Sequence, residues 1–128
     1  MFQSLDVFQT AFDMARYAGQ RQAVTARNIA NADTPGYRAQ KMDSFADTYR
    51  GGETTALRST RAGHIGGTDS GASAARVQIA DAEPSPNGNS VSLEEEMLRS
   101  VEIQREYDRA LAIYKHGLDV LQTSIGRR

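Results

Sequence analysis

Apolar residues recur at alternating intervals of three and four near the beginning of the chain. The repeating positions are Leu5, Phe8, Phe12, Ala15, Gly19, Gln22, Ala26 and Ile29. This spacing is typical of a helix that supercoils against a partner, and it predicts an N-terminal helix over residues 1–32. Further apolar side chains, among them Val7 and Val24, lie beside this row. The apolar surface is therefore wider than a two-stranded interface requires.

The same alternation runs without a break near the end of the chain. Its positions are Leu93, Met97, Ser100, Gln104, Tyr107, Leu111, Tyr114, Leu118, Leu121 and Ile125. Ser92 followed by Glu95 forms a capping box, and the three glutamates at 94–96 place negative charge at the positive end of the helix dipole. The pattern predicts a C-terminal helix within residues 91–128. From Leu93 to Ile125 this helix would span about 50 Å.

The middle of the chain has a different composition. Residues 51–89 contain seven of the 11 Gly and two of the three Pro, and no aromatic residue. Their large aliphatic residues are Leu57, Ile65, Val77 and Ile79. Because so few apolar groups cannot offset the entropy lost on ordering, we predict a turn and an irregular central segment over residues 33–90. Within it, Val77 and Ile79 are expected to anchor a short β-hairpin or an extended arm against neighbours.

These segments together predict a mainly α-helical fold. Two long terminal helices form a coiled-coil hairpin, with a Gly/Pro-rich middle that is partly disordered or contains short β-structure, and the whole is one elongated domain. The pattern leaves open whether the two helices run parallel or antiparallel. Packing them on each other buries one row of each helix. The remaining apolar rows stay exposed, and exposed rows of this kind mark surfaces for partners.

Charge and composition narrow the classes of function. The chain has 15 basic and 16 acidic residues, a formal net charge of -1, so it lacks the basic field that holds nucleic acid or an anionic membrane. Without Cys it has no disulfide framework and no thiolate site. No apolar run is long enough to predict a membrane-spanning helix. The N-terminus lacks the basic-then-apolar pattern of a cleaved signal peptide, so export would need another route.

The sequence contains no constellation that predicts catalysis, a metal site or a cofactor. His64 and His116 have no second His, Cys or carboxylate at ligand spacing. The glutamates at 94–96 fit a helix N-terminus better than an acidic metal cluster. A mixed charge run consists of Glu102, Arg105, Glu106, Asp108 and Arg109. It is either a solvated helix face or a set of pairs that fixes the register between subunits.

A turn signal follows the first predicted helix. Its candidate residues are Asn28, Asn31, Asp33, Thr34, Pro35, Gly36 and Tyr37. Pro-Gly fits the central positions of a type II turn, and the short polar side chains before it can satisfy helix-end groups. The hydroxyl of Tyr37 would then be available for a partner. Two interpretations stand equal at this point: a rigid corner that fixes where the next segment leaves the helix, and an ordinary helix stop.

Two of these stretches resemble a known family. Asn28-Ile-Ala-Asn-Ala-Asp-Thr-Pro-Gly-Tyr-Arg38 is similar to the N-terminal signature of bacterial flagellar rod and hook proteins. Gly88-Asn-Ser-Val-Ser-Leu-Glu-Glu-Glu-Met97, followed by Tyr107 and a long helix, resembles the proximal rod members of that family. Within the proximal rod, the short chain and the unaltered Thr-Pro-Gly-Tyr turn favour the neighbour of FlgC over FlgC itself. The resemblance covers about residues 1–50 and 84–128.

The resemblance implies a structural subunit of the flagellar basal-body rod in the periplasm, without enzymatic activity. Such a subunit links the membrane ring to the distal rod and hook and transmits torque. It is exported uncleaved by the flagellar type III apparatus and assembles by coiled-coil packing of its terminal helices. The implied partners are other copies of the chain, the rod protein FlgC, the adaptor FliE and the ring protein FliF. No nucleic acid, small-molecule substrate or cofactor is implied.

Two sets of residues acquire a role from this resemblance. An assembly seam between subunits would consist of Leu5, Phe8, Phe12, Ile29, Leu93, Met97, Tyr107, Leu111, Tyr114, Leu118, Leu121 and Ile125. Phe8 and Phe12 also match the Phe-x-x-x-apolar spacing of an export-recognition motif in this family.

A second interpretation does not depend on the resemblance. The chain would be a cytoplasmic helical adaptor or chaperone whose apolar stripes hold a partner helix. This interpretation predicts a discrete soluble complex, whereas a rod subunit is incorporated into a filament.

Overall fold

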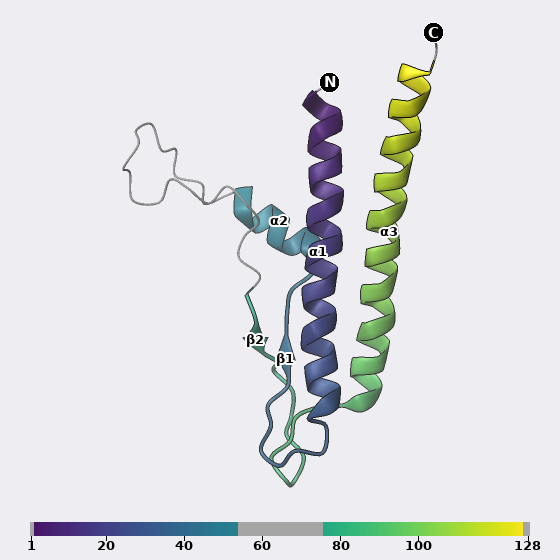
Figure 1. Cartoon of the computed structure of the whole chain (residues 1–128). Coiled ribbons are helices and arrows are strands. Elements are labelled where there is room, and N and C mark those ends of the chain that lie inside the picture. Colours follow the sequence, from purple (N-terminus) through teal and green to yellow (C-terminus); the bar gives the residue numbers. More distant parts are fainter. Residues whose placement is uncertain (1, 54–75, 127–128) are drawn as a thin grey trace.

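The chain folds into two long helices with a thin layer of short elements on one side (Figure 1). The computed structural model describes residues 2–53 and 76–126, with side chains over 6–49 and 76–126. Leu57, His64 and Ile65 lie outside the described residues, and so does the side chain of Leu5.

The long helices are α1 (Phe2–Ala30) and α3 (Leu93–Ile125). They run antiparallel, because Phe8 near the start of α1 contacts Gly117 near the end of α3, whereas Gln22 bonds to Ser100. This arrangement confirms the predicted mainly α-helical fold with its terminal helices packed together. None of the helices in the described ranges combines the length and the apolar character needed to cross a membrane.

The row of α3 that faces α1 lies one residue earlier than the sequence pattern suggested. The buried positions are Glu96, Ile103 and Ala110, seven residues apart, and Gly117 continues the row against the ring of Phe8. A Cβ atom at Gly117 would lie 2.9 Å from two carbons of that ring, so the absence of a side chain is what admits it. The larger apolar residues one position later in the chain are exposed.

The first helix shows the same displacement by one residue. Ala11, Ala18 and Thr25 are almost fully buried, whereas Phe12 is 63% exposed. Residues 11, 18 and 25 lie three positions after 8, 15 and 22, so they share the face that carries the contacts to α3. Small side chains let the two backbones approach closely. Residue size explains the displacement only at Ala11, whose predicted neighbour Phe12 is larger, because Gly19 and Ala26 are smaller than Ala18 and Thr25.

The other side of α1 is covered by short elements: β1 (Gln40–Lys41), α2 (Phe45–Glu53) and β2 (Gln78–Ile79) (Figure 1). Tyr17, Val24 and Met42 form a small apolar cluster there, with Phe45 packed against it. The hydroxyl of Tyr17 donates to the carbonyl of Asp43 at 3.0 Å, so the one polar atom of this ring is satisfied within the layer.

The two strands pair antiparallel, with Gln40 opposite Ile79 and Lys41 opposite Gln78. The expected β-structure near residues 77–79 is therefore present, and in the described part of the chain β2 pairs with the segment that follows α1. Val77 and Ile79 are 47% and 59% exposed. They contribute little to the packing of this chain, and their role as anchors against other molecules stays a prediction.

Candidate functional site

Two segments far apart in the sequence meet at the end of the helix pair, where α1 stops and α3 begins (Figure 1). One follows α1 (residues 31–39) and the other precedes α3 (residues 85–92). Together with Asn28 they are here called the corner. Both stretches on which the family resemblance rested contribute to it.

The predicted type II turn is present in the first segment. The N–H of Tyr37 donates to the carbonyl of Thr34 at 3.2 Å, and Gly36 has a φ of 74°, as the third residue of such a turn requires. Pro35 supplies the fixed φ of the second position. The turn reverses the chain directly after the last turn of α1, so the next segment can run back along the helix as β1.

Asn89 joins the two segments, and sequence reasoning missed its role. Its side-chain amide is buried and donates to three backbone carbonyls of the first segment: Asn31 at 2.9 Å, Ala32 at 2.8 Å and Thr34 at 2.8 Å. Its Oδ1 accepts from the N–H of Val91 at 2.8 Å. The carbonyls of Asn31 and Thr34 also accept backbone N–H groups, from Thr34 and Tyr37, so the Asn89 amide adds a second bond to each of them. The same side chain bonds to the carbonyl of Ala32 and fixes the approach to α3.

Asn28 joins α1 to β1 in a similar way. It is fully buried, its Nδ2 donates to the carbonyl of Gln40 at 2.7 Å, and its Oδ1 accepts from the N–H of Gln40 at 3.0 Å. The Asn28 amide thus forms with Gln40 the pair of hydrogen bonds that a neighbouring strand would otherwise provide. The hydroxyl of Tyr37, which we expected to be free for a partner, instead donates to Asn28 Oδ1 at 3.2 Å.

Backbone contacts complete the corner. The N–H of Gly36 donates to the carbonyl of Asn87 at 3.1 Å, and the N–H of Ser90 donates to the carbonyl of Tyr37 at 3.0 Å. Gly88 has a φ of 81°, and a Cβ atom there would lie 3.3 Å from Gly36 Cα, so the two glycines let the segments cross closely. These contacts support the rigid-corner interpretation over an ordinary helix stop.

The remaining motif residues act locally. The side chain of Asn31 donates to the carbonyl of Arg27 at 2.8 Å, and its Oδ1 accepts from the hydroxyl of Thr34 at 3.2 Å. Asp33 is exposed. These three side chains thus lie at the surface of the turn, outside the bonds that join the two segments.

The beginning of α3 agrees with the expected cap. Ser92 is the N-cap residue, and its hydroxyl accepts from the N–H of Glu95 at 3.5 Å. Glu94 and Glu95 are exposed, as charges that stabilise a helix end can be. Glu96 differs, because it is buried and pairs with Arg99. The helix-dipole explanation is therefore incomplete for Glu96.

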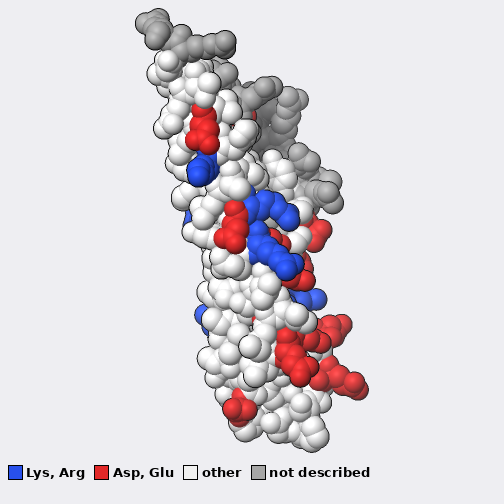
Figure 2. Space-filling view, turned by 90° about the vertical axis from the view of Figure 1, so that its right-hand side faces the viewer, with Lys and Arg blue, Asp and Glu red and all other residues white. Residues whose placement is uncertain are grey.

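One member of the charge run of α3 has a role that neither interpretation gave it. Glu106 forms an ion pair with Arg21 of α1, which joins the two helices of one chain. Glu102, Arg105, Asp108 and Arg109 are exposed, and acidic and basic side chains lie interspersed on the outer face of the molecule in Figure 2. For these four residues, a solvated face and pairing between subunits both stay predictions.

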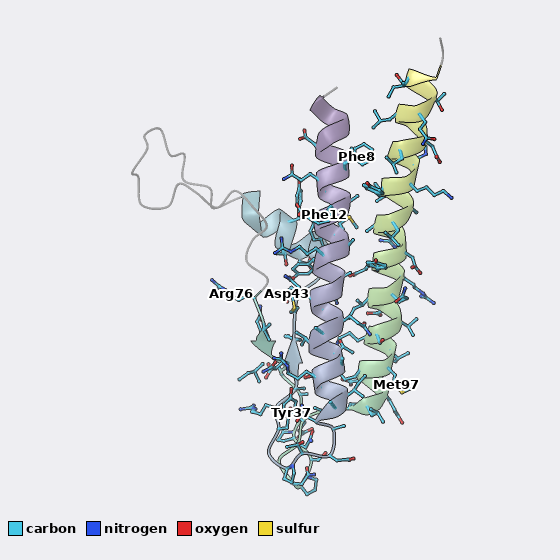
Figure 3. All side chains as sticks on the ribbon, viewed as in Figure 1. Phe8, Phe12, Tyr37, Asp43, Arg76 and Met97 are labelled. Atoms are coloured by element: carbon cyan, nitrogen blue, oxygen red, sulfur yellow. The ribbon has the colours of Figure 1, made fainter. Side chains whose placement is uncertain are left out.

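The assembly-seam residues remain largely uncovered within one chain. Those of α3 with a third or more of their surface exposed are Leu93, Met97, Tyr107, Leu111, Tyr114, Leu118 and Ile125. Their alternating spacing places them along one flank of the helix, beside the row that contacts α1. Met97 points away from α1 in Figure 3.

The two phenylalanines of the export spacing have different surroundings. Phe8 lies between the helices (Figure 3), edge-to-face with Tyr114 at 5.4 Å between ring centroids, whereas Phe12 is largely exposed.

The described residues hold no cluster of three His, Asp or Glu side chains of the kind that binds a metal ion. His116 is exposed on α3. The side chains of Asn28 and Asn89, which are buried in the corner, both form internal hydrogen bonds.

Comparison with known proteins gives a consistent result. A family model described as "Flagella basal body rod protein" matches residues 18–38, which include the end of α1 and the turn. The flagellar basal body rod protein FlgB of Agrobacterium fabrum is 33% identical over 88% of this chain and 87% of its own length. That of Escherichia coli is 36% identical over 73% of both chains, and that of Cereibacter sphaeroides is 30% identical over 82% of both. These relatives give no support to the adaptor interpretation. The chain belongs to the family of flagellar basal-body rod proteins, among the FlgB proteins.

Proposed function

We propose that the chain is a structural subunit of the flagellar rod and that it assembles through the exposed flank of α3. The observation that carries this proposal is the seam itself: seven large apolar side chains of one helix stay exposed along a single flank. Covering such a row with helices of other subunits would remove it from water and stabilise the assembly. A heterologous contact of this kind, repeated without closure, builds a filament.

The finer parts of the proposal rest on the family. The subunit would lie in the proximal, periplasmic part of the rod, contact FlgC, FliE, FliF and further copies of itself, and carry no catalytic role. It would leave the cytoplasm through the type III apparatus without a cleaved signal peptide, with Phe8 and Phe12 as the export-recognition residues. Terminal helices and corner would act together as one elongated unit.

A pair of variants tests the seam. Leu118→Glu places a charge on the proposed contact flank. Ala112→Glu adds the same charge on the outer face, three or four residues from Asp108, Arg109 and Lys115. Losing the burial of one leucine costs about 2 kcal/mol, which corresponds to a roughly 30-fold weaker contact. We expect Leu118→Glu to be depleted from purified basal bodies in quantitative mass spectrometry, while Ala112→Glu is incorporated like the unmodified chain.

The interpretation of these variants depends on where the protein accumulates. Recovery of the unmodified chain only in the cytoplasm, bound to one soluble partner, would contradict the rod assignment. Equal incorporation of both variants would contradict the seam but leave the assignment intact. Secreted protein is measured in parallel, because a loss before export would mimic a loss of assembly.

The corner is tested in the same assay. Replacing Pro35 and Gly36 by Ala removes the fixed φ and the favoured positive φ of the turn. We expect incorporation into the rod to fall more than secretion does, because the segment after α1 would leave the helix in a different direction. Unchanged secretion together with normal motility would show that the corner does not guide assembly.

A further inference from the structure

The corner contains a dipeptide with its own chemistry. Asn87 is exposed, and it is followed by Gly88. In an Asn-Gly pair the glycine nitrogen can attack Cγ of the asparagine without hindrance from a following side chain. A bond forms between that nitrogen and Cγ, the side-chain nitrogen leaves as ammonia, and a five-membered succinimide results. Water then opens the ring and leaves either aspartate or isoaspartate, so no oxidant or further reactant is needed.

The folded corner holds each group that this reaction must move. The attacking group, the N–H of Gly88, donates to the carbonyl of Ser85 at 2.7 Å. The side chain that must be attacked is fixed through its Oδ1, which accepts from the N–H of Asn89 at 3.0 Å. The carbonyl of Asn87, which must rotate during ring closure, accepts from the N–H of Gly36 at 3.1 Å. Three hydrogen bonds therefore have to break before the nitrogen can reach Cγ.

We propose that Asn87 is a modification site controlled by the conformation of the corner. While the corner is closed, Asn87 keeps its amide. When the corner opens, in a chain that is incompletely folded or locally unfolded, succinimide formation proceeds at the rate of a flexible Asn-Gly pair. This inference rests on the hydrogen bonds of the loop alone and does not depend on the proposed function.

The isoaspartate product would prevent the corner from closing again. Isoaspartate routes the main chain through the former side chain and adds a methylene group between residues 87 and 88. The carbonyl that accepts from Gly36 and the N–H of Asn89 would then no longer keep their spacing. A corner that opens and forms isoaspartate would thus be marked permanently, and the bond network centred on Asn89 would be lost with it.

The rate of deamidation in the full-length chain tests the proposal. The protein is incubated in a mildly alkaline buffer, with and without denaturing urea at the same temperature, and the peptide containing residue 87 is followed by mass spectrometry. Local opening populates the reactive form only in proportion to its equilibrium constant, so we expect a rate roughly tenfold or more lower in the native sample. Equal rates in both samples would overturn the proposal.

A variant separates the corner from the rest of the fold. Asn89→Ala removes the side chain that joins the segments but leaves the Asn87–Gly88 dipeptide intact. We expect it to deamidate at position 87 faster than the unmodified chain in native buffer, whereas Ile125→Ala, a change at the far end of α3, keeps the native rate. An unchanged rate in Asn89→Ala would overturn the proposal. Asn31, followed by Ala32, serves in the same samples as an internal reference of low reactivity.

Discussion

Removing the Asn89 side chain should lower the free energy of unfolding, although Asn89 lies outside the apolar contacts between the helices. Two amide hydrogens serve three carbonyl oxygens, so one hydrogen is shared, and Oδ1 accepts one further bond. Two donated hydrogens and one accepted bond, each contributing about 1 kcal/mol net, give a loss of about 3 kcal/mol for Asn89→Ala. The bonds of this side chain are shielded from water at its own end, because Asn89 is 3% exposed.

A comparison of variants makes the assay specific. Asn87→Ala removes an exposed side chain of the same loop that accepts a single bond, so it should cost about 1 kcal/mol or less. Asn89→Asp keeps the shape but presents carboxylate oxygens to three carbonyls, so it should cost more than Asn89→Ala. The measurement is urea unfolding followed by far-ultraviolet circular dichroism, with equal m-values as the condition for comparison. A cost for Asn89→Ala no greater than that for Asn87→Ala would refute the assigned role.

Three further predictions concern single positions. Gly36→Ala should lower the free energy of unfolding by about 1 kcal/mol in urea titrations, because a residue with a side chain is strained at this positive φ although nothing lies near its Cβ. An unchanged free energy would show that the turn relaxes. Gly19→Ala should stabilise the chain by about 1 kcal/mol, and Gly117→Ala by clearly less or not at all, because only the second displaces an aromatic ring; equal gains would argue against the close contact. Arg21→Met and Glu106→Gln, combined in a double-mutant cycle, should show a coupling of about 1–2 kcal/mol that weakens at high salt; additive effects would mean that this pair does not fix the register.

Features that depend on neighbouring residues could be predicted from the sequence. The bounds of α3 agree with the pattern from Leu93 to Ile125, because the Ser92 cap and the periodicity are both local signals. The Pro35–Gly36 turn is local in the same sense. The position of β-structure near Val77 also follows from composition, but its pairing partner lies 37 to 39 residues earlier in the chain and leaves no signal there.

Contacts between distant segments account for what the sequence did not reveal. Asn89 bonds to the carbonyl of Asn31, 58 residues away, and an asparagine just before a helix cap has many ordinary explanations. The contact row between the helices lies one residue earlier than predicted. Hydrophobicity favours Phe12 and Leu118, whereas close packing selects Ala11 and Gly117. The resemblance to rod proteins did identify both stretches of the corner, but it could not show that they bond to each other.

Because β1 pairs with β2, the length of the segment between them can vary without moving the two long helices. The chain leaves this strand pair after Lys41 and returns to it at Gln78, and these two residues lie opposite each other. When the ends of a segment are already held together, lengthening it costs only a logarithmic entropy, about 0.6 kcal/mol for each doubling. Insertions and deletions after α2 and before β2 should therefore leave the helices and the corner in register. Related chains can differ in the length of this segment without changing the parts that carry the fold.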